Sequence, residues 1–296
     1  MTPSPPERER LWIVGPGRMG LAFGLLLRAA GALESLTYTG GRSAPPSHPL
    51  LAGAAPFARL LAAGHPPEEG TTGILLAVPD AALTPAAEAL AASGVPRGVP
   101  VLHLSGSRGA EALSALAESG TPVGSLHPLA AVADPVSGAE RLRGAAYGVE
   151  GEGAARVFAL RLVTAAGGVA LPMEAGGKPL YHAAAVFASN YVVTLLALAE
   201  RFMERAGIPA AEGRSALASL AAGAVENVRE WGPAGALTGP VLRGERETIL
   251  LHLSRLSGEE SALYSLLGRE TLALARQQGL DGEAAASLGA ILGEKA

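Results

Sequence analysis

The sequence predicts an α/β domain with a mostly parallel sheet over residues 8–174, followed by an all-helical domain over residues 175–296. In the first part, short apolar runs alternate with helical stretches, which is typical of parallel sheets covered on both faces. After Gly176 and Gly177 this pattern changes, and no convincing strand follows. With 49% apolar and only 17% charged residues, the chain is too apolar for intrinsic disorder.

The expected strands are short and apolar, and turn residues flank them. They cover residues 11–14, 35–41, 74–79, 99–106, 121–128, 145–151 and 167–173. The expected helices cover residues 21–31, 154–166, 179–206 and 210–231, and helical patterns resume from about residue 248. Pro179 suits the first position of the helix that opens the second domain.

A glycine-rich motif follows the first strand and opens the first helix. Gly15, Gly17 and Gly20 form a G-x-G-x-x-G that includes Arg18 and Met19. In this position the first glycine permits a tight turn, the second admits a pyrophosphate, and the third allows close helix–strand packing. The motif therefore predicts a Rossmann-type, doubly wound sheet that binds a dinucleotide at a helix N-terminus.

The end of the second strand decides which dinucleotide is bound. NAD-specific sites place Asp or Glu there, but this chain has Gly41, Arg42 and Ser43. An arginine and a serine suit a 2′-phosphate, because a guanidinium binds phosphate through paired donors. We expect NADP(H) as the cofactor. The alternative is that Arg42 is only a solvated loop residue.

Polar residues follow three further strands. Val78 and Pro79, then Ser105 and Ser107, then His127 all come at strand ends. Ligands in such sheets bind outside the carboxyl ends of the strands. We expect Val78, Pro79 and Ser105 to contact the cofactor and Ser107 to contact the substrate.

Six motifs resemble a bacterial family of Rossmann-like proteins whose helical C-terminal domain has no assigned function. They are GPGRMG, AVPD, HLSG, SLHPL, YHAAAVFASNY and ALTGPVLRGE. The family is similar to the group that holds 6-phosphogluconate dehydrogenase, β-hydroxyacid dehydrogenases, ketopantoate reductases and pyrroline-carboxylate reductases. The resemblance implies an NADP-dependent oxidoreductase with a helical dimerisation domain, and some relatives are regarded as ketopantoate reductases. The chain departs from its relatives after SLHPL, where it has Ala130, Ala131 and Val132.

Four residues are candidates for the catalytic chemistry. His127 resembles the histidine of the His-Pro pair in prephenate dehydrogenases, although it can equally be a structural histidine at a strand end. His182 lies in the first turns of the helix that opens the second domain, four residues after Lys178. Asn190 matches an amide that β-hydroxyacid dehydrogenases and ketopantoate reductases carry four residues after a catalytic lysine. Here Val186 occupies the lysine position, so the proton donor is His182, His127 or Lys178.

A second polar cluster lies in the helical domain. Thr238 and Arg243 are candidate substrate ligands, because a guanidinium binds a carboxylate through two donors. The alternative is an ordinary turn and surface ion pair. The sequence has no cysteine and no metal-binding motif, so we expect no metal.

Charge and hydropathy limit the partners. The net charge of −4 implies no basic face for nucleic acid or an anionic membrane. The uncharged stretch 183–199 is slightly short for a membrane span, and it is better interpreted as a helix buried in a soluble core or a homodimer interface. The absence of cysteine leaves the compartment open, and the cytoplasm is the default.

The sequence therefore supports an NADP-dependent reductase of a small oxo-acid or related carbonyl compound. Because Val186 occupies the position of the catalytic lysine, a dinucleotide-binding sensor or scaffold without turnover remains an alternative. Reduction of an imine of the pyrroline-carboxylate type, or of a deazaflavin, and a prephenate dehydrogenase-like activity also remain open.

Overall fold

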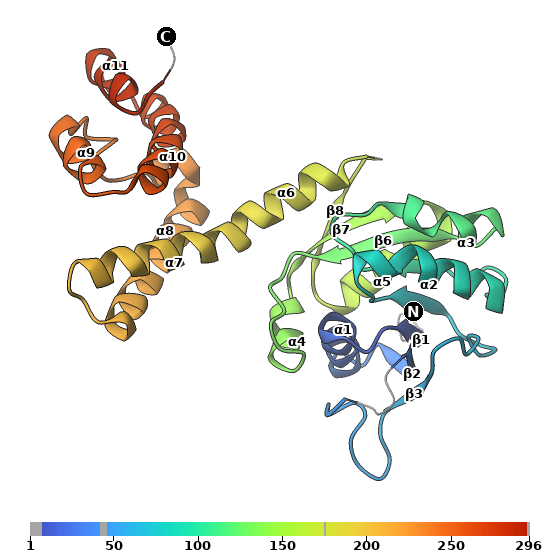
Figure 1. Ribbon diagram of the computed structural model, residues 1–296. Coiled ribbons are helices and arrows are strands. Elements are labelled where there is room, and N and C mark those ends of the chain that lie inside the picture. The colour runs from blue at the N-terminus through green and yellow to red at the C-terminus, as the bar shows by residue number, and fades with distance from the viewer. Residues whose placement is uncertain (1–7, 42–45, 175, 295–296) are drawn as a thin grey trace, which may run out of the picture. The chain divides into compact units, whose positions relative to one another are not determined.

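The computed structural model describes residues 8–41, 46–174 and 176–294. By its internal contacts the chain forms two compact units, Met1–Val192 and Val193–Ala296. The first unit contains the sheet and the second contains helices, as Figure 1 shows.

An eight-stranded sheet organises the first unit. Its order is β3-β2-β1-β4-β5-β6-β7-β8, and every neighbouring pair is parallel except β6 and β7. The strands are β1 (Glu9–Val14), β2 (Leu33–Gly40), β3 (Ala58–Ala62), β4 (Gly73–Leu76), β5 (Val101–His103), β6 (Val123–Pro128), β7 (Ala146–Gly151) and β8 (Val169–Pro172). The predicted Rossmann-type, mostly parallel sheet is confirmed.

Helices cover both faces of the sheet, because the apolar side chains of each strand alternate between the faces. Leu11 and Ile13 of β1 face the core that includes α1 and α5, and Trp12 faces the core beneath α2. The helices of this unit are α1 (Arg18–Ala29), α2 (Asp80–Ser93), η1 (Ala110–Leu113), α3 (Ser114–Glu118), α4 (Ser137–Leu142), α5 (Gly153–Ala165) and α6 (Lys178–Ala188).

The sequence did not predict β3. This five-residue edge strand, ARLLA, contains no β-branched or aromatic residue, so neither its propensity nor its alternation indicates a strand. It pairs with β2 alone, in parallel register from Leu36 opposite Ala58. Its formation depends on that neighbour and not on its own sequence.

The long helix expected over residues 179–206 is interrupted at Ser189. That residue has φ −127° and ψ −69°, so α6 ends at Ala188 and α7 (Asn190–Arg205) begins after it. No residue of α7 is buried. Of the two settings expected for this stretch, the chain's own core does not apply, and the homodimer interface stays a prediction. By length and composition, Lys178–Arg205 is the one described stretch apolar enough to cross a membrane, with a mean hydropathy of 1.6, and one such stretch is weak evidence for a span.

The second unit has a small core of its own. Ile249, Leu272 and Leu288 are fully buried where three helices meet. The remaining helices are α8 (Ala210–Gly235), α9 (Arg246–Leu253), α10 (Gly258–Gln277) and α11 (Gly282–Ile291). No strand occurs among the described residues of this unit, as predicted.

Candidate functional site

The glycine-rich turn between β1 and α1 packs directly against the end of β4. Gly15 has φ +105°, and a Cβ there would lie 2.5 Å from the Ala77 carbonyl oxygen. A Cβ on Gly20 would lie 2.4 Å from the Gly15 oxygen. Glycine is therefore required at both positions by the protein's own packing.

Gly17 differs from these two glycines. Its φ is −85°, which any residue adopts, and a Cβ there would have one neighbour, the Ala77 oxygen at 3.9 Å. Packing does not explain this glycine. Gly17 is the N-cap of α1, and no side chain caps the helix, so its first N–H groups are open to a ligand. The turn therefore has the form of an anion cradle whose backbone a phosphate can approach.

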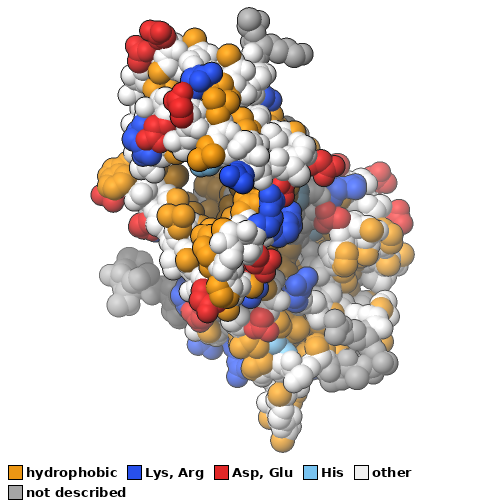
Figure 2. All heavy atoms as spheres, turned by 60° about the vertical axis from the view of Figure 1, so that its left-hand side comes forward, with side chains coloured by type: hydrophobic (Ala, Val, Ile, Leu, Met, Phe, Trp, Pro, Cys, Tyr) orange, Lys and Arg blue, Asp and Glu red, His pale blue; other side chains and the backbone are white. Residues whose placement is uncertain are grey.

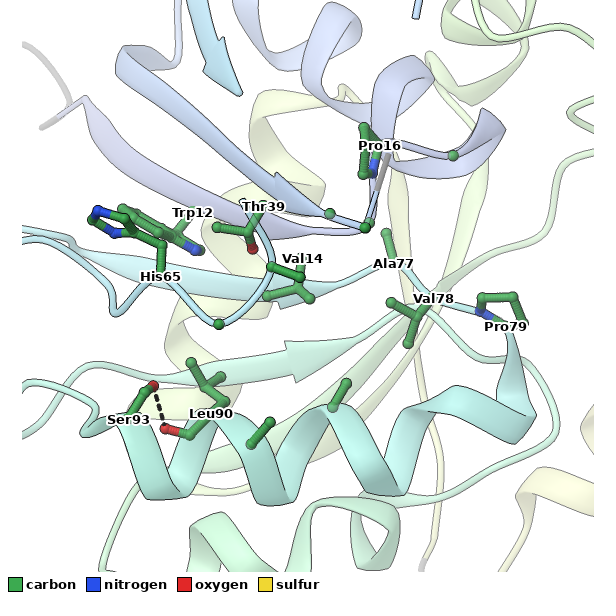
Figure 3. A pocket seen from close by; sticks show the side chains of 18 residues that line it. Trp12, Val14, Pro16, Thr39, His65, Ala77, Val78, Pro79, Leu90 and Ser93 are labelled. Atoms are coloured by element: carbon green, nitrogen blue, oxygen red, sulfur yellow. Dashed lines mark hydrogen bonds between the residues drawn. The ribbon is translucent and has the colours of Figure 1, made fainter. Parts of the chain in front are cut away.

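A cleft of about 470 Å³ adjoins this turn and extends along β1 toward α2 (Figure 3). The connection from β3 to β4, residues 63–72, contains no helix, although parallel crossovers usually carry one. Of the predicted cofactor ligands, those that line the cleft are Gly15, Gly17, Gly41, Val78 and Pro79.

The other predicted cofactor ligands lie elsewhere. Arg18 is exposed and Met19 half-buried in the first turn of α1, and Ser105 belongs to the polar group described below. Arg42 and Ser43 lie outside the described residues.

The inner wall of the cleft contains Trp12 and His65, which no sequence pattern indicated as site residues. Trp12 is 2% exposed, and its indole stacks on the His65 ring with 6.1 Å between the centroids, as Figure 3 shows. The Trp12 Nε1 atom is buried without a hydrogen-bond partner among the described residues. Buried polar groups normally have a partner, so this donor fits a ligand that enters the cleft. The cleft and its turn therefore fit a dinucleotide.

A second polar group lies at the ends of β4 and β5. The Ser107 hydroxyl donates to the Asp80 carboxylate, which joins the start of α2 to the loop after β5. The Ser105 hydroxyl accepts the amides of Ser107 and Arg108 at 3.2 and 3.1 Å. Burial opposes ionisation of Asp80, but the hydrogen bonds from Ser107 and Ser105 outweigh it and lower the pKa of this carboxyl.

The first turn of α6 supplies three more side chains to this group. Lys178, Tyr181 and His182 are three and four residues apart and so share one helix face. Lys178 is only 2% exposed, and its Nζ donates to the Ser105 carbonyl oxygen at 2.9 Å. Burial lowers the pKa of Lys178 to about 8, although the charges of Glu150, Asp80 and Glu111 raise it.

Tyr181 fixes the protonation of His127. Its hydroxyl donates to the His127 carbonyl oxygen at 3.1 Å and therefore accepts from His127 Nδ1 at 3.0 Å, since a hydroxyl has one proton. This assigns the proton to Nδ1 and leaves Nε2 as an acceptor. Tyr181 was not among the predicted site residues, although its helical spacing from Lys178 and His182 places it on their face. Gly148 makes room for the ring, because a Cβ there would lie 2.7 Å from the phenol.

His127 and His182 converge on one point. A Cβ on Gly106 would lie 2.7 Å from both His127 Nε2 and His182 Nδ1, and the two ring centroids are 6.2 Å apart. His182 Nδ1 is buried and has no partner among the described residues. Burial, followed by the charges of Lys178 and His182, lowers the pKa of His127 to about 4. At neutral pH the group thus combines a neutral His127 with a protonated Lys178.

The remaining candidates are less informative. Asn190 begins α7 and is exposed. Thr238 and Arg243 belong to the helical unit, where Arg243 forms an exposed ion pair with Glu245 at 2.6 Å. Within the described ranges, no group of three or more His, Asp or Glu side chains is placed to hold a metal ion.

A family model described as "Domain of unknown function (DUF2520)" matches residues 145–271. No curated protein matches the chain. Several solved structures are similar to the chain. A protein from Thermotoga maritima is 20% identical and has a TM-score of 0.70, covering 90% of this chain and 99% of its own.

Two further solved structures are similar. A putative NADP oxidoreductase from Bacteroides fragilis has 18% identity and a TM-score of 0.68, covering 89% of this chain and 98% of its own. A pyrroline carboxylate reductase from Plasmodium falciparum, solved with NADP bound, has 13% identity and a TM-score of 0.58, covering 96% and 99%. The chain therefore has the fold of this group of proteins.

Proposed function

We propose that this protein is an NADP-dependent reductase of a small carbonyl or imine compound. The observation that carries the proposal is the edge formed by the carboxyl ends of the parallel strands. There, an anion cradle and a dinucleotide-sized cleft lie at β1, and a buried group of protonatable side chains lies at β4, β5 and β6. In open α/β sheets this edge is where ligands bind.

The first unit supplies candidate contacts for most of the dinucleotide. The bare turn at Gly17 and the open N–H groups of α1 would hold the pyrophosphate, and the cleft lined by Val78 and Trp12 would hold the adenosine part. No carboxylate occurs between Glu34, at the start of β2, and Glu68, which favours NADP over NAD. When bound, the cofactor supplies a hydride to the substrate. The neighbours described as NADP proteins support the same choice.

The buried group would supply the proton. Reduction of a carbonyl leaves a developing negative charge on oxygen, which needs a proton donor. Reduction of an imine depends less on a proton donor. Lys178 is the acid, because it remains protonated at neutral pH while His127 remains neutral. His127 Nε2 and His182 Nδ1 converge where a substrate atom needs hydrogen-bond partners.

The direct test is a panel of 2-oxo acids and cyclic imines assayed for NADPH oxidation. Imines belong in the panel because one structural neighbour is a pyrroline carboxylate reductase. Steady oxidation with any member supports the reductase. Tight NADPH binding without turnover across the panel contradicts it and favours a dinucleotide sensor.

Replacing Gly17 separates cofactor binding from folding. Gly17→Ala introduces a Cβ with one protein neighbour at 3.9 Å, so the thermal midpoint should not change. The methyl group should obstruct the pyrophosphate and weaken NADPH binding by at least about tenfold, which is about 1.4 kcal/mol. Calorimetric titration measures the affinity. Gly20→Ala is the matched control: its Cβ would clash at 2.4 Å, so it should lower the midpoint. Unchanged NADPH affinity in Gly17→Ala would overturn the placement of the cofactor.

Arg42 is proposed to bind the 2′-phosphate. Arg42→Ala should weaken NADPH at least about tenfold and leave NADH nearly unchanged, because only NADPH carries that phosphate. Arg97→Ala is a suitable control, since Arg97 is exposed in the loop that enters β5 and so lies at the opposite edge of the sheet. Equal losses for the two cofactors, or no loss for NADPH, would refute the role of Arg42.

Lys178 should control the alkaline limb of activity. An acid must be protonated, so turnover should fall as the pH rises through about 8, the pKa of Lys178. Lys178→Met should lower kcat by about 10²–10⁴ and remove that limb, while NADPH affinity is retained. If the variant keeps both the rate and the limb, another residue is the acid.

The titration of Lys178 can be observed directly, because the sequence contains only one other lysine, Lys295. Selective labelling with [13Cε]lysine should give two signals, and Lys178→Met assigns them. We expect the Lys178 signal to titrate near pH 8, against about 10.4 for an unperturbed lysine. A value near 10.4 for both signals would remove the physical basis for Lys178 as the acid.

We further propose that the protein is a cytoplasmic homodimer that associates through its helices. Helices α6, α7 and α8 carry large apolar side chains that are exposed. Examples are Phe187, Val193 and Leu220, with 67%, 68% and 72% of their surface accessible. Figure 2 shows one face of the molecule, with hydrophobic side chains (orange) open at the surface. Exposed large apolar side chains of this kind are typical of association sites.

Sedimentation tests the dimer. The wild type should sediment as a dimer at micromolar concentration, and Leu220→Glu should shift it toward monomer, because a charge in an apolar interface is costly. Val157→Glu alters an exposed apolar residue on α5, at 54% exposure, and should leave the dimer intact. A monomeric wild type, or equal effects of both variants, would contradict this interface.

A further inference from the structure

The helical unit contains a pocket of about 840 Å³ that no part of the proposed reductase uses. Phe202 of α7, Leu251 and His252 of α9, Arg255 and Leu256 of the following loop, and Tyr264 of α10 line it. The volume lies within the range of small-molecule sites, about 300–1,000 Å³.

The wall of the pocket is held in place by Arg205. Its guanidinium donates to both carboxylate oxygens of Glu260 at 3.0 and 2.9 Å and to the Arg255 carbonyl oxygen at 2.6 Å. Glu260 also completes a capping box with Ser257 at the start of α10. The loop that carries Arg255 is therefore tied to α7 and to α10, and its backbone is fixed before any ligand arrives.

The charges of Arg205 and Glu260 neutralise each other, but the charge of Arg255 has no such partner. The Arg255 guanidinium makes no hydrogen bond or ion pair with any residue in the described part of the chain. The backbone of this arginine is therefore fixed while its five donors remain available.

The rest of the pocket lining combines a polar pair with apolar side chains. His252 Nδ1 and the Tyr264 hydroxyl are 2.8 Å apart, and their rings meet edge to face with 5.8 Å between the centroids. Phe202, Leu251 and Leu256 supply the apolar part of the lining. An unpaired cation beside aromatic and aliphatic side chains is complementary to a carboxylate on a flat apolar body.

We propose that this pocket binds a small aromatic carboxylate, whose carboxylate pairs with Arg255 and whose ring lies on Phe202, Leu251 and Leu256. A guanidinium binds a carboxylate through two parallel donors. Arg205 holds the main chain of Arg255 beside the pocket and leaves the Arg255 guanidinium available for such a pair. Binding at this site needs no dinucleotide and no turnover, so it is independent of the proposed reductase.

The test uses benzoate as the probe on the full chain without cofactor. We expect saturable binding by calorimetry, together with shifts of the His252 ring signals in [13C]histidine-labelled protein. Benzamide, which keeps the ring but not the charge, should bind at least about tenfold more weakly. Inorganic phosphate tests whether charge alone is sufficient, and we expect it to leave the His252 signals in place.

Three variants locate the site. Arg255→Gln should weaken benzoate at least about tenfold, and Arg255→Lys should restore part of the loss, because a lysine keeps the charge without the fork. Arg229→Gln on α8 is the control: Arg229 is also exposed and pairs with Glu226, and its replacement should leave benzoate binding unchanged.

Three results would overturn the proposal. One is the absence of saturable binding up to about 10 mM, a concentration that fills nine-tenths of a site with a dissociation constant of ~1 mM. The second is equal affinity for benzoate and benzamide. The third is equal loss of binding in Arg255→Gln and Arg229→Gln, which would indicate general attraction to a positively charged surface.

Discussion

The close packing of the β1–α1 turn against β4 is the constraint on which the candidate site depends. Gly15 and Gly20 have no space for a side chain, because the Ala77 and Gly15 carbonyl oxygens lie where their Cβ atoms would stand. The Ala77 amide donates to the Val14 carbonyl oxygen at 2.8 Å, which continues the sheet to the turn itself. The N-terminus of α1 is thereby brought to the carboxyl edge of the sheet. Neighbouring parallel strands end at the same edge of the sheet, so the loops after β4 and β5 lie at this edge as well.

The buried cation at this edge is a lysine, which is a rare residue in this chain. Only two of its 23 basic side chains are lysines, and one of them, Lys178, is buried. An arginine would stay charged under all conditions, whereas burial brings the pKa of a lysine close to neutrality. The same burial, with the charge of Lys178 close by, keeps His127 neutral, so one low-dielectric environment produces an acid and a neutral acceptor side by side. His103 supports the loop that separates them, since its Nδ1 accepts the Ser105 amide and its Nε2 bonds the Gly109 oxygen.

Most of the fold was predictable because its signals are local. Apolar runs of strand length and the spacing of the glycine motif identified seven of the eight strands and the cradle. Two features were not local. β3 has the composition of a helix or loop and becomes a strand only by pairing with β2. The interruption at Ser189 lies in a continuous apolar pattern that gives no sign of a break. In the site, helical spacing places Lys178 and Tyr181 on one face, but it cannot tell that this face meets the ends of β5 and β6. That depends on the tertiary packing of α6.

The position of Lys178 also bears on how the chain differs from the enzymes that it resembles. The resemblance implies a lysine four residues before the amide that matches Asn190, and this chain has Val186 at that position. Lys178 lies eight residues before Val186 in the same helix, a displacement of about 12 Å along the axis. A side chain cannot span that distance, so Lys178 does not substitute for the missing lysine at the same point in space. Instead it is bound to the loop after β5, beside the imidazoles of His127 and His182. If Lys178 donates the proton, the reacting atom of the substrate must lie near the Gly106 loop. On that proposal most substrate contacts come from strand-end residues of the first unit, and none is required from position 186.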